Sequence, residues 1–390
     1  MELSENQPKF KSMSHLQGLC QWIGVVSSRL PNLSWSQAKV LGEYSYGMVM
    51  TRRSGLSTIA DYMAQLKGEA GNTARQRLRE WCYDAPDKAG AQRQEVEVVQ
   101  CFEPLLSWIV SWWRSGEKQL VLALDATNLG QRFTVLVVSV VYRGCAIPVA
   151  WAIVPGTTPG AWKPHWLGLL ALVHRALPRK WCVLVLTDRG LYARWLYQAI
   201  RGYRWHPFMR ITAGGQYRRR QGKTWHPLSS LVRQNGAVLA RRVVCFKTAS
   251  AQLDCTVLAC WHTGYADPWL IVTDLPMSQA NVVWYAMRAW IESGFKDFKR
   301  GGWRWEQTKM TRPERAERLW LVMSVATLWV LSVGGEADLE VSPATLPALP
   351  VLRCLSCFVQ GLNLILVAVS LALPLPFGRF FPEDWPKAPA

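Results

Sequence analysis

The chain has 390 residues, of which half are hydrophobic and 18% are charged. This composition excludes wholesale disorder and is enough to build two or three domains with a buried core. The 45 Lys and Arg residues exceed the 27 Asp and Glu residues and give a formal net charge of +18. Such an excess favours a polyanionic partner such as nucleic acid, because cations that neutralise phosphates release counterions. Ribosomal and membrane-surface proteins are also basic, so charge alone does not decide between these classes.

Residues 1–115 are expected to form a helical domain. The polar N-terminus lacks the basic start and apolar core of a signal peptide, and the ten scattered cysteines are typical of a reducing cytoplasm. Residues 56–63 and the Arg-rich run 72–81 predict two helices around a Gly-rich turn, with Asn72 as the cap of the second. This pattern is typical of a DNA-binding helix-turn-helix, and equally of an ordinary pair of surface helices.

Residues 116–211 alternate between apolar runs and amphipathic segments and form the first part of the predicted core. Strands are expected over residues 120–125, 133–142, 146–154, 181–188 and 203–211, with helices over 162–177 and 191–200. Three strands, a helix, a strand, a helix and a strand is the order of a ribonuclease-H-like core. The predicted class is therefore α/β, with a mixed sheet covered by helices on both faces.

Residues 212–277 show short alternating runs broken by glycines, and they predict a β-rich insertion. Helical periodicity resumes over 278–335, the second part of the core. Residues 336–390 are expected to hold a Pro-rich linker, over 336–352, and a C-terminal helix, over 355–373. The apolar run 319–333 is too short to cross a bilayer, and polar residues interrupt the last helix, so buried or dimerising helices are favoured over membrane spans.

Three carboxylates are candidates for one site. Asp125 and Asp188 end two apolar strands that the topology makes neighbours, and Glu292 lies on a later helix. Residues at the carboxyl ends of strands line the crevice where open sheets bind ligands. Converging carboxylates repel unless cations neutralise them, and hard oxygen ligands suit Mg²⁺ or Mn²⁺. Taken singly, each acid has an ordinary interpretation: a turn or cap for the aspartates, and a helical ion pair with Arg288 for Glu292.

A run in the second part of the core reads Tyr285, Arg288, Glu292 and Lys299. On one helix these spacings of three, four and seven residues place all four side chains on the same face. A carboxylate flanked by a phenol, a guanidinium and an ammonium suits a phosphodiester. The acid would hold a metal ion, and the other groups would hold phosphate oxygens.

This spacing, together with Asp125-Ala-Thr and Thr187-Asp188-Arg189-Gly190, resembles the DDE transposases of bacterial insertion sequences. The group concerned carries a Tyr-Arg-Glu-Lys signature (insertion-sequence family four), and the resemblance covers roughly residues 115–335. It implies that the three acids ligate two metal ions and that the other signature residues hold phosphate near a transposon end. It also implies a homodimer bound to double-stranded DNA in a bacterial cytoplasm, associated with the nucleoid, with no membrane partner.

Two further residues are candidates for DNA contacts. The segment Trp269-Leu-Ile-Val-Thr273-Asp-Leu-Pro276 is similar to a family segment whose Trp stacks on a base flipped out during hairpin formation. Core packing is the alternative for Trp269. Arg210, at the end of the fifth expected strand, is a candidate phosphate contact.

The predicted function is cut-and-paste transposition: binding of inverted-repeat ends, two-metal cleavage through a hairpin, and joining of the 3′ ends to target DNA. Two alternatives remain at this point. One is a ribonuclease-H-like nuclease without strand transfer. The other is a catalytically silent DNA-binding relic or repressor of transposition.

Overall fold

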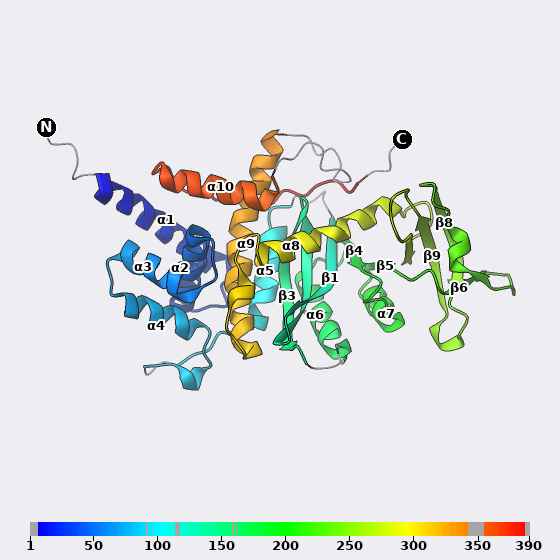
Figure 1. The fold of residues 1–390 in the computed structure, drawn as a ribbon, viewed down its shortest axis with the longest axis horizontal. Coiled ribbons are helices and arrows are strands. Elements are labelled where there is room, and N and C mark those ends of the chain that lie inside the picture. The colour runs from blue at the N-terminus through cyan, green and yellow to red at the C-terminus, as the bar shows by residue number, and fades with distance from the viewer. Residues whose placement is uncertain are drawn as a thin grey trace.

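The computed structural model describes residues 7–90, 93–113, 118–157, 160, 162–341 and 355–386. The N-terminal helices lie at one end and strands β6, β8 and β9 at the other, with the long helix α9 between the N-terminal helices and the sheet (Figure 1). The protein is thus a mixed α/β structure built around one large sheet, as the predicted class requires.

The sheet has ten strands in the order β3-β2-β1-β4-β5-β10-β9-β8-β6-β7. Its first half holds β1 (Gln119–Leu129), β2 (Phe133–Tyr142), β3 (Cys145–Pro155), β4 (Cys182–Thr187) and β5 (His206–Arg210). Strands β4 and β5 run parallel to β1, and β2 runs antiparallel to β1 and β3. The five strands and two helices, α6 (Lys163–Ala176) and α7 (Arg194–Gly202), lie close to the predicted ranges.

The strands of the predicted insertion continue the same sheet. They are β6 (Gln216–Arg219), β7 (His226–Pro227), β8 (Val238–Cys245), β9 (Leu253–Cys260) and β10 (Trp269–Thr273), with short 3₁₀ turns η3 (Leu228–Leu231) and η4 (Ala249–Ala251). β10 pairs antiparallel with β5, with Ile271 opposite Arg210. This pairing brings the end of the insertion beside the strands that carry the candidate acids.

Successive side chains along β1 point to opposite faces of the sheet and so belong to two different core clusters. Leu120, Leu122 and Leu124 belong to the larger cluster, while Val121 and Ala123 pack with Tyr285 and Ile291 in a second cluster. The second cluster lies under η5 (Val282–Ala289) and α8 (Trp290–Phe298), and α8 crosses the sheet in Figure 1. Because strand side chains alternate between the two faces, Asp125 and Thr127 lie on the face that η5 and α8 cover.

The N-terminal region contains α1 (Gln7–Arg29), α2 (Trp35–Thr51), α3 (Leu56–Lys67), α4 (Gly71–Trp81) and α5 (Phe102–Val110), with 3₁₀ turns η1 (Ala85–Asp87) and η2 (Val98–Cys101). The two helices predicted around the Gly-rich turn form as α3 and α4. The capping role predicted for Asn72 is wrong, because α4 begins at Gly71 and its extended cap residue is Ala70. Asn72 is already helical, so its side chain does not cap the helix start. Arg77 binds the buried carboxylate of Glu43 at 2.7 Å and so anchors α4 to α2.

Helix α9 (Pro313–Val341) follows the 3₁₀ turn η6 (Trp305–Gln307). Its buried side chains run through the larger core cluster. It includes the predicted fifteen-residue apolar run but is nearly twice as long. By length and composition Pro313–Leu339 could cross a membrane, yet 94% of its most apolar window is buried inside the protein, which is typical of a core helix. The predicted linker is corrected in part: residues 336–341 continue α9, and residues 342–354 lie outside the described chain.

The C-terminal helix α10 (Cys357–Ser370) forms close to its predicted range and crosses α9 at two glycines. A Cβ added to Gly361 would lie 1.9 Å from the carbonyl oxygen of Val330, and one added to Gly334 would lie 1.9 Å from that of Cys357. Both contacts are with backbone, which cannot rotate away. The crossing therefore requires glycine on both helices.

Replacing Gly361 with alanine is expected to lower the free energy of unfolding by about 1–3 kcal/mol, because the added methyl forces the two helices apart. Gly168→Ala in α6 is the matched control, since nothing lies within 4 Å of its added Cβ; it should leave stability unchanged or raise it by up to ~1 kcal/mol. Urea unfolding followed by circular dichroism measures both. Equal stability of the two variants would contradict the described crossing.

Candidate active site

Asp125 and Asp188 lie side by side where the parallel pairing of β1 and β4 ends. The paired register ends with Leu124 opposite Thr187, so the next residue on each chain is an aspartate. Asp188 follows β4, as predicted. Asp125 does not end its strand, because β1 continues to Leu129 along β2; it lies where the parallel pairing with β4 stops. The strand geometry therefore brings the two acids to one edge.

One guanidinium contacts all three candidate acids. Nη2 of Arg288 lies 2.6 Å from Oδ2 of Asp125 and 3.7 Å from Oδ2 of Asp188, and Nη1 donates to Oε1 of Glu292. The Arg288 side chain is only 14% exposed, whereas that of Glu292 is 57% exposed. The three predicted carboxylates are thus brought together, with Arg288 between them.

Burial controls the electrostatics of this cluster. It raises the pKa of Asp125 to about 6, against the opposing effects of the Arg288 charge and of a hydrogen bond from the Ala126 amide, and the charges of Asp188 and Glu292 raise the pKa further. Burial by itself would lower the pKa of Arg288, but the neighbouring carboxylates raise it overall. The site therefore holds more negative charge than its single guanidinium balances.

Asp188 also has a local structural contact. Its Oδ1 accepts a hydrogen bond from the amide of Leu191 at 3.0 Å, as a turn-forming aspartate does. Its other oxygen faces Arg288. The ordinary turn role and the site role therefore use different oxygens of the same carboxylate.

The signature residues do not all share one α-helix, as the sequence predicted. Tyr285 and Arg288 lie in the 3₁₀ turn η5, where side chains three residues apart line up, and Glu292 lies in the first turn of α8. Lys299 follows the end of α8 at Phe298. Tyr285, Arg288 and Glu292 thus still share one face, whereas Lys299 lies beyond the end of the helix.

The side chain of Lys299 forms hydrogen bonds with strand β1. Its Nζ donates to Oγ1 of Thr127 at 2.7 Å and to the carbonyl of Asn128 at 3.1 Å, and burial lowers its pKa. Thr127 lies two residues beyond Asp125, on the same face of the strand. This acceptor role was not predicted, although the Asp125-Ala-Thr motif contains the residue.

Tyr285 is buried beside the two aspartates. Its hydroxyl donates to the carbonyl of Thr187 at 3.3 Å, and burial raises its pKa to about 12. The phenol therefore remains protonated at neutral pH and serves as a hydrogen-bond donor next to Asp188.

Trp269 and Arg210 lie on the neighbouring strands β10 and β5, and Trp269 contacts the site through Tyr285. The rings of Trp269 and Tyr285 form an edge-to-face pair with centroids 5.3 Å apart. Nη2 of Arg210 donates to the carbonyl of Pro268 at 3.0 Å, while its buried Nε has no partner among the described residues. Trp269 is half-buried, so it packs on Tyr285 without being fully enclosed.

The chemistry of the donors fits a hard divalent cation. Asp125 and Asp188 each place an oxygen within 4 Å of the same cationic nitrogen, so one cation already lies between them, and oxygen ligands are those that Mg²⁺ and Mn²⁺ prefer. The third acid faces the other nitrogen of Arg288. Within the described ranges, no three His, Cys, Asp or Glu residues form a ready-made metal cluster.

Comparison with known proteins gives one family match. Residues 167–329 match the model of the transposase DDE domain, a range that includes Asp188 and Glu292 and begins after Asp125. The structure of a piggyBac transposase synaptic complex with hairpin DNA has 11% sequence identity and a TM-score of 0.32. That match covers 65% of this chain and 57% of the other. No curated protein matches the chain. The family match supports a DDE transposase.

The buried state of Asp125 predicts a pH-dependent stability. Its pKa rises from an ordinary 3.8 to about 6 in the folded protein, so its contribution to stability is fully present below pH 3.8 and is lost as pH rises through 6. Between pH 4 and 7 in EDTA, wild type should lose up to ~3 kcal/mol of unfolding free energy relative to Asp125→Asn. Urea titrations of both proteins measure this difference, and a flat difference over that range would contradict the described burial.

Proposed function

We propose that this protein is a cut-and-paste DNA transposase in which Asp125, Asp188 and Glu292 are the catalytic carboxylates. The observation that carries the proposal is the convergence of these acids on Arg288. Two of them come from adjacent parallel strands, and the third comes from the helix that packs over those strands. Three carboxylates around one largely buried guanidinium leave uncompensated negative charge, which is costly to bury and which bound cations would offset.

The strand order supports a ribonuclease-H-like core. Strands β3-β2-β1-β4-β5 lie consecutively in the sheet, the first three antiparallel and the last two parallel to β1. In the proposed layout, this core spans residues 116–211 and 278–335, and the strands of residues 212–277 extend its sheet. Residues 1–115 form the DNA-binding helical domain.

The three carboxylates would hold two Mg²⁺ or Mn²⁺ ions. Such ions activate an attacking oxygen and stabilise a leaving oxygen in an in-line phosphoryl displacement. The chain contributes positive and donor groups around the phosphate. Arg288 can exchange its carboxylate partners for phosphate oxygens, and Lys299 and the Tyr285 hydroxyl lie at the same edge. Guanidinium and ammonium groups form strong charge-assisted bonds with phosphates.

One such site can perform every step of transposition. Water attacks the phosphorus at the transposon end and releases a 3′ hydroxyl. That hydroxyl attacks the opposite strand and closes a hairpin, which water reopens, and the 3′ hydroxyl finally attacks target DNA. Each step forms one P–O bond and breaks another, with a different attacking oxygen.

The Tyr-Arg-Glu-Lys spacing supports assignment to the insertion-sequence group and, with it, the hairpin route. A hairpin requires a strained strand end, and an aromatic platform can hold a flipped base with ~1–3 kcal/mol of stacking. The exposed part of Trp269 offers such a platform. Arg210 holds the carbonyl of the preceding residue, Pro268, so it would fix Trp269 and leave other N–H groups for phosphate.

Exposed apolar side chains on α10 and just beyond it support a homodimer that holds two transposon ends. Leu364, Val367 and Leu371 are all exposed although large apolar residues favour burial. A second copy of this chain would cover them in a synaptic complex. The basic, cysteine-containing chain suits a bacterial cytoplasm, where it would associate with the nucleoid.

The proposal is tested by comparing Glu292→Gln with Glu103→Gln. Both acids are exposed and lie in the first turn of a helix, but only Glu292 belongs to the acid cluster around Arg288. End-labelled DNA from immediately outside the gene is incubated with Mg²⁺ or EDTA and resolved on a denaturing gel. Wild type and Glu103→Gln should give a metal-dependent nick and then a hairpin, and Glu292→Gln should lose roughly 10²-fold or more of this activity.

A gel-shift assay accompanies the cleavage assay, and Glu292→Gln should bind DNA as wild type does. Nicks without hairpins or joined products would instead indicate a nuclease without strand transfer. A sequence-specific shift without cleavage by the folded wild-type protein would indicate a DNA-binding relic.

A further inference from the structure

A basic cleft of about 650 Å³ separates the N-terminal helices from the start of α9. One wall is formed by the turn before α3 and by the exposed face of α4, and the other by Arg304, residues 307–312, Arg315 and Leu319. Two hydrogen bonds hold the walls in place: Ser54 N–H to the carbonyl of Trp303 at 2.7 Å, and Trp81 Nε1 to the carbonyl of Arg318 at 3.0 Å. The cleft is therefore built into the fold.

Cations line this cleft and no carboxylate does. Arg312 is paired with Asp84 and Asp87, and Arg315 with Asp87; neither aspartate lines the cleft. Five other cations have no carboxylate partner within the described chain: Arg53, Arg75, Arg79, Arg304 and Lys309. Gathering unpaired like charges in a concavity is unfavourable unless an anion joins them, and it concentrates positive potential there.

Two further features suit phosphate oxygens. Helix α3 begins in the cleft after Gly55, which provides no side-chain cap, so the amides of Leu56, Ser57 and Thr58 can donate to an anion. The Tyr83 ring lies 4.1 Å from the Arg315 guanidinium and 5.4 Å from that of Arg79, which orients both cations.

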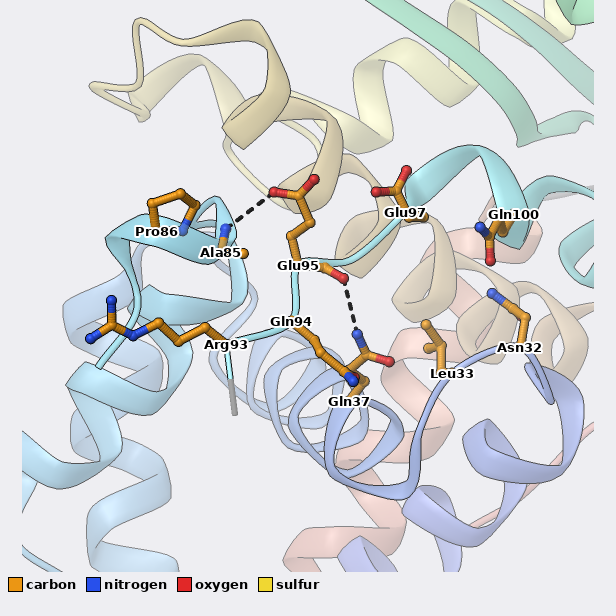
Figure 2. Close-up of a pocket in the computed structure, with 10 residues that line it drawn as sticks. All are labelled: Asn32, Leu33, Gln37, Ala85, Pro86, Arg93, Gln94, Glu95, Glu97 and Gln100. Carbon is orange, nitrogen blue, oxygen red and sulfur yellow. Dashed lines mark hydrogen bonds between the residues drawn. The ribbon is translucent and has the colours of Figure 1, made fainter. Parts of the chain in front are cut away.

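A second hollow in the N-terminal region has the opposite character (Figure 2). It has about 540 Å³ and contains Glu95, Glu97 and a single cation, Arg93. Its polar groups are partly used internally, since Gln37 donates to the carbonyl of Glu95. The concentration of unpaired cations therefore distinguishes the basic cleft from this second hollow.

The basic cleft connects to the candidate active site through a short, braced segment. The Arg304 amide bonds the carbonyl of Lys299 at 2.8 Å, and Lys299 itself contacts Thr127. Farther along, Arg132 donates to the carbonyls of Thr308 and Met310 at 2.6 and 2.9 Å. The five residue steps from Lys299 to Arg304 span at most ~18 Å, which is about the length of five base pairs of duplex.

We propose that the basic cleft binds the phosphodiester backbone of duplex DNA a few base pairs from the phosphate being cleaved. The inference rests on the proposed function, since it places the same DNA in both sites. The cleft would fix the register of the duplex through its backbone, because phosphate contacts position a protein on DNA. The N-terminal helices thereby contribute to substrate placement as well as to end recognition.

The test compares Arg75→Gln/Arg79→Gln with Arg175→Gln/Arg179→Gln. Each pair removes two exposed charges four residues apart, the first on the cleft face of α4 and the second in or just after α6. Anisotropy of a labelled duplex is measured in EDTA at several salt concentrations, with terminal-repeat and random sequences. The cleft variant should bind roughly 10-fold more weakly, and the slope of log K against log salt should shrink by about 1.8.

The control variant should change the affinity by less than about 2-fold. Equal behaviour of the two variants would overturn the proposal. If the cleft variant fails to fold by circular dichroism, Lys309→Gln on the opposite wall replaces it, with an expected slope change of about 0.9. If the cleft variant binds DNA more weakly, as expected, but wild type cleaves no DNA, the result would count against the proposed function and would still support DNA binding by the cleft.

Discussion

The site depends on one guanidinium, that of Arg288, which lies between three converging carboxylates and balances part of their charge. The parallel pairing of β1 and β4 forces Asp125 and Asp188 together, and η5 and α8 lie over that edge with Glu292 exposed beside them. Without a cation, the mutual repulsion of these acids would disfavour their charged forms at this edge of the sheet. Arg288 provides that cation from within the 3₁₀ turn, so the conformation of η5 and the position of α8 are tied to the charge balance of the site.

The strand that carries Asp125 organises much more than the acid itself. Thr127 and Asn128 on β1 hold Lys299, and Arg132 in the following turn braces the segment that leads to the basic cleft. The buried helix α9 then joins this segment to the N-terminal region. There the Arg318 side chain donates hydrogen bonds to the carbonyls of Val96 and Cys82. The β1–β2 hairpin thus connects a site suited to phosphate chemistry with a cleft suited to phosphate binding.

Much of this arrangement could be predicted because it follows from local patterns. Apolar runs located β1 to β5, and the spacings of three and four residues placed Tyr285, Arg288 and Glu292 on one side even though η5 is not an α-helix. Lys299 could not be placed in the same way. Its helix ends at Phe298, and Gly301 and Gly302 approach the backbone of Lys296 and Asp297 too closely for a side chain, so the chain turns back there.

Non-local contacts account for the other differences. The pairing of β10 with β5 joins residues about sixty positions apart. The alternation of apolar and polar residues within a strand does not indicate which other strand it pairs with. The cap of α4 was misassigned because Asn72 has the right side chain one residue beyond the turn, where the backbone is already helical. The basic cleft was not predicted either, since its cations come from three separate segments, each of which reads as an ordinary solvated face.

The most direct measurement is a crystal structure of the full chain with DNA and Mn²⁺, using anomalous scattering to locate the metal. We expect anomalous peaks about 2.1 Å from oxygens of Asp125, Asp188 and Glu292, with Arg288 turned from these carboxylates toward a phosphate. Peaks elsewhere on the chain, with Arg288 still bound to Asp125 while DNA is bound to the protein, would contradict a catalytic role for the three acids.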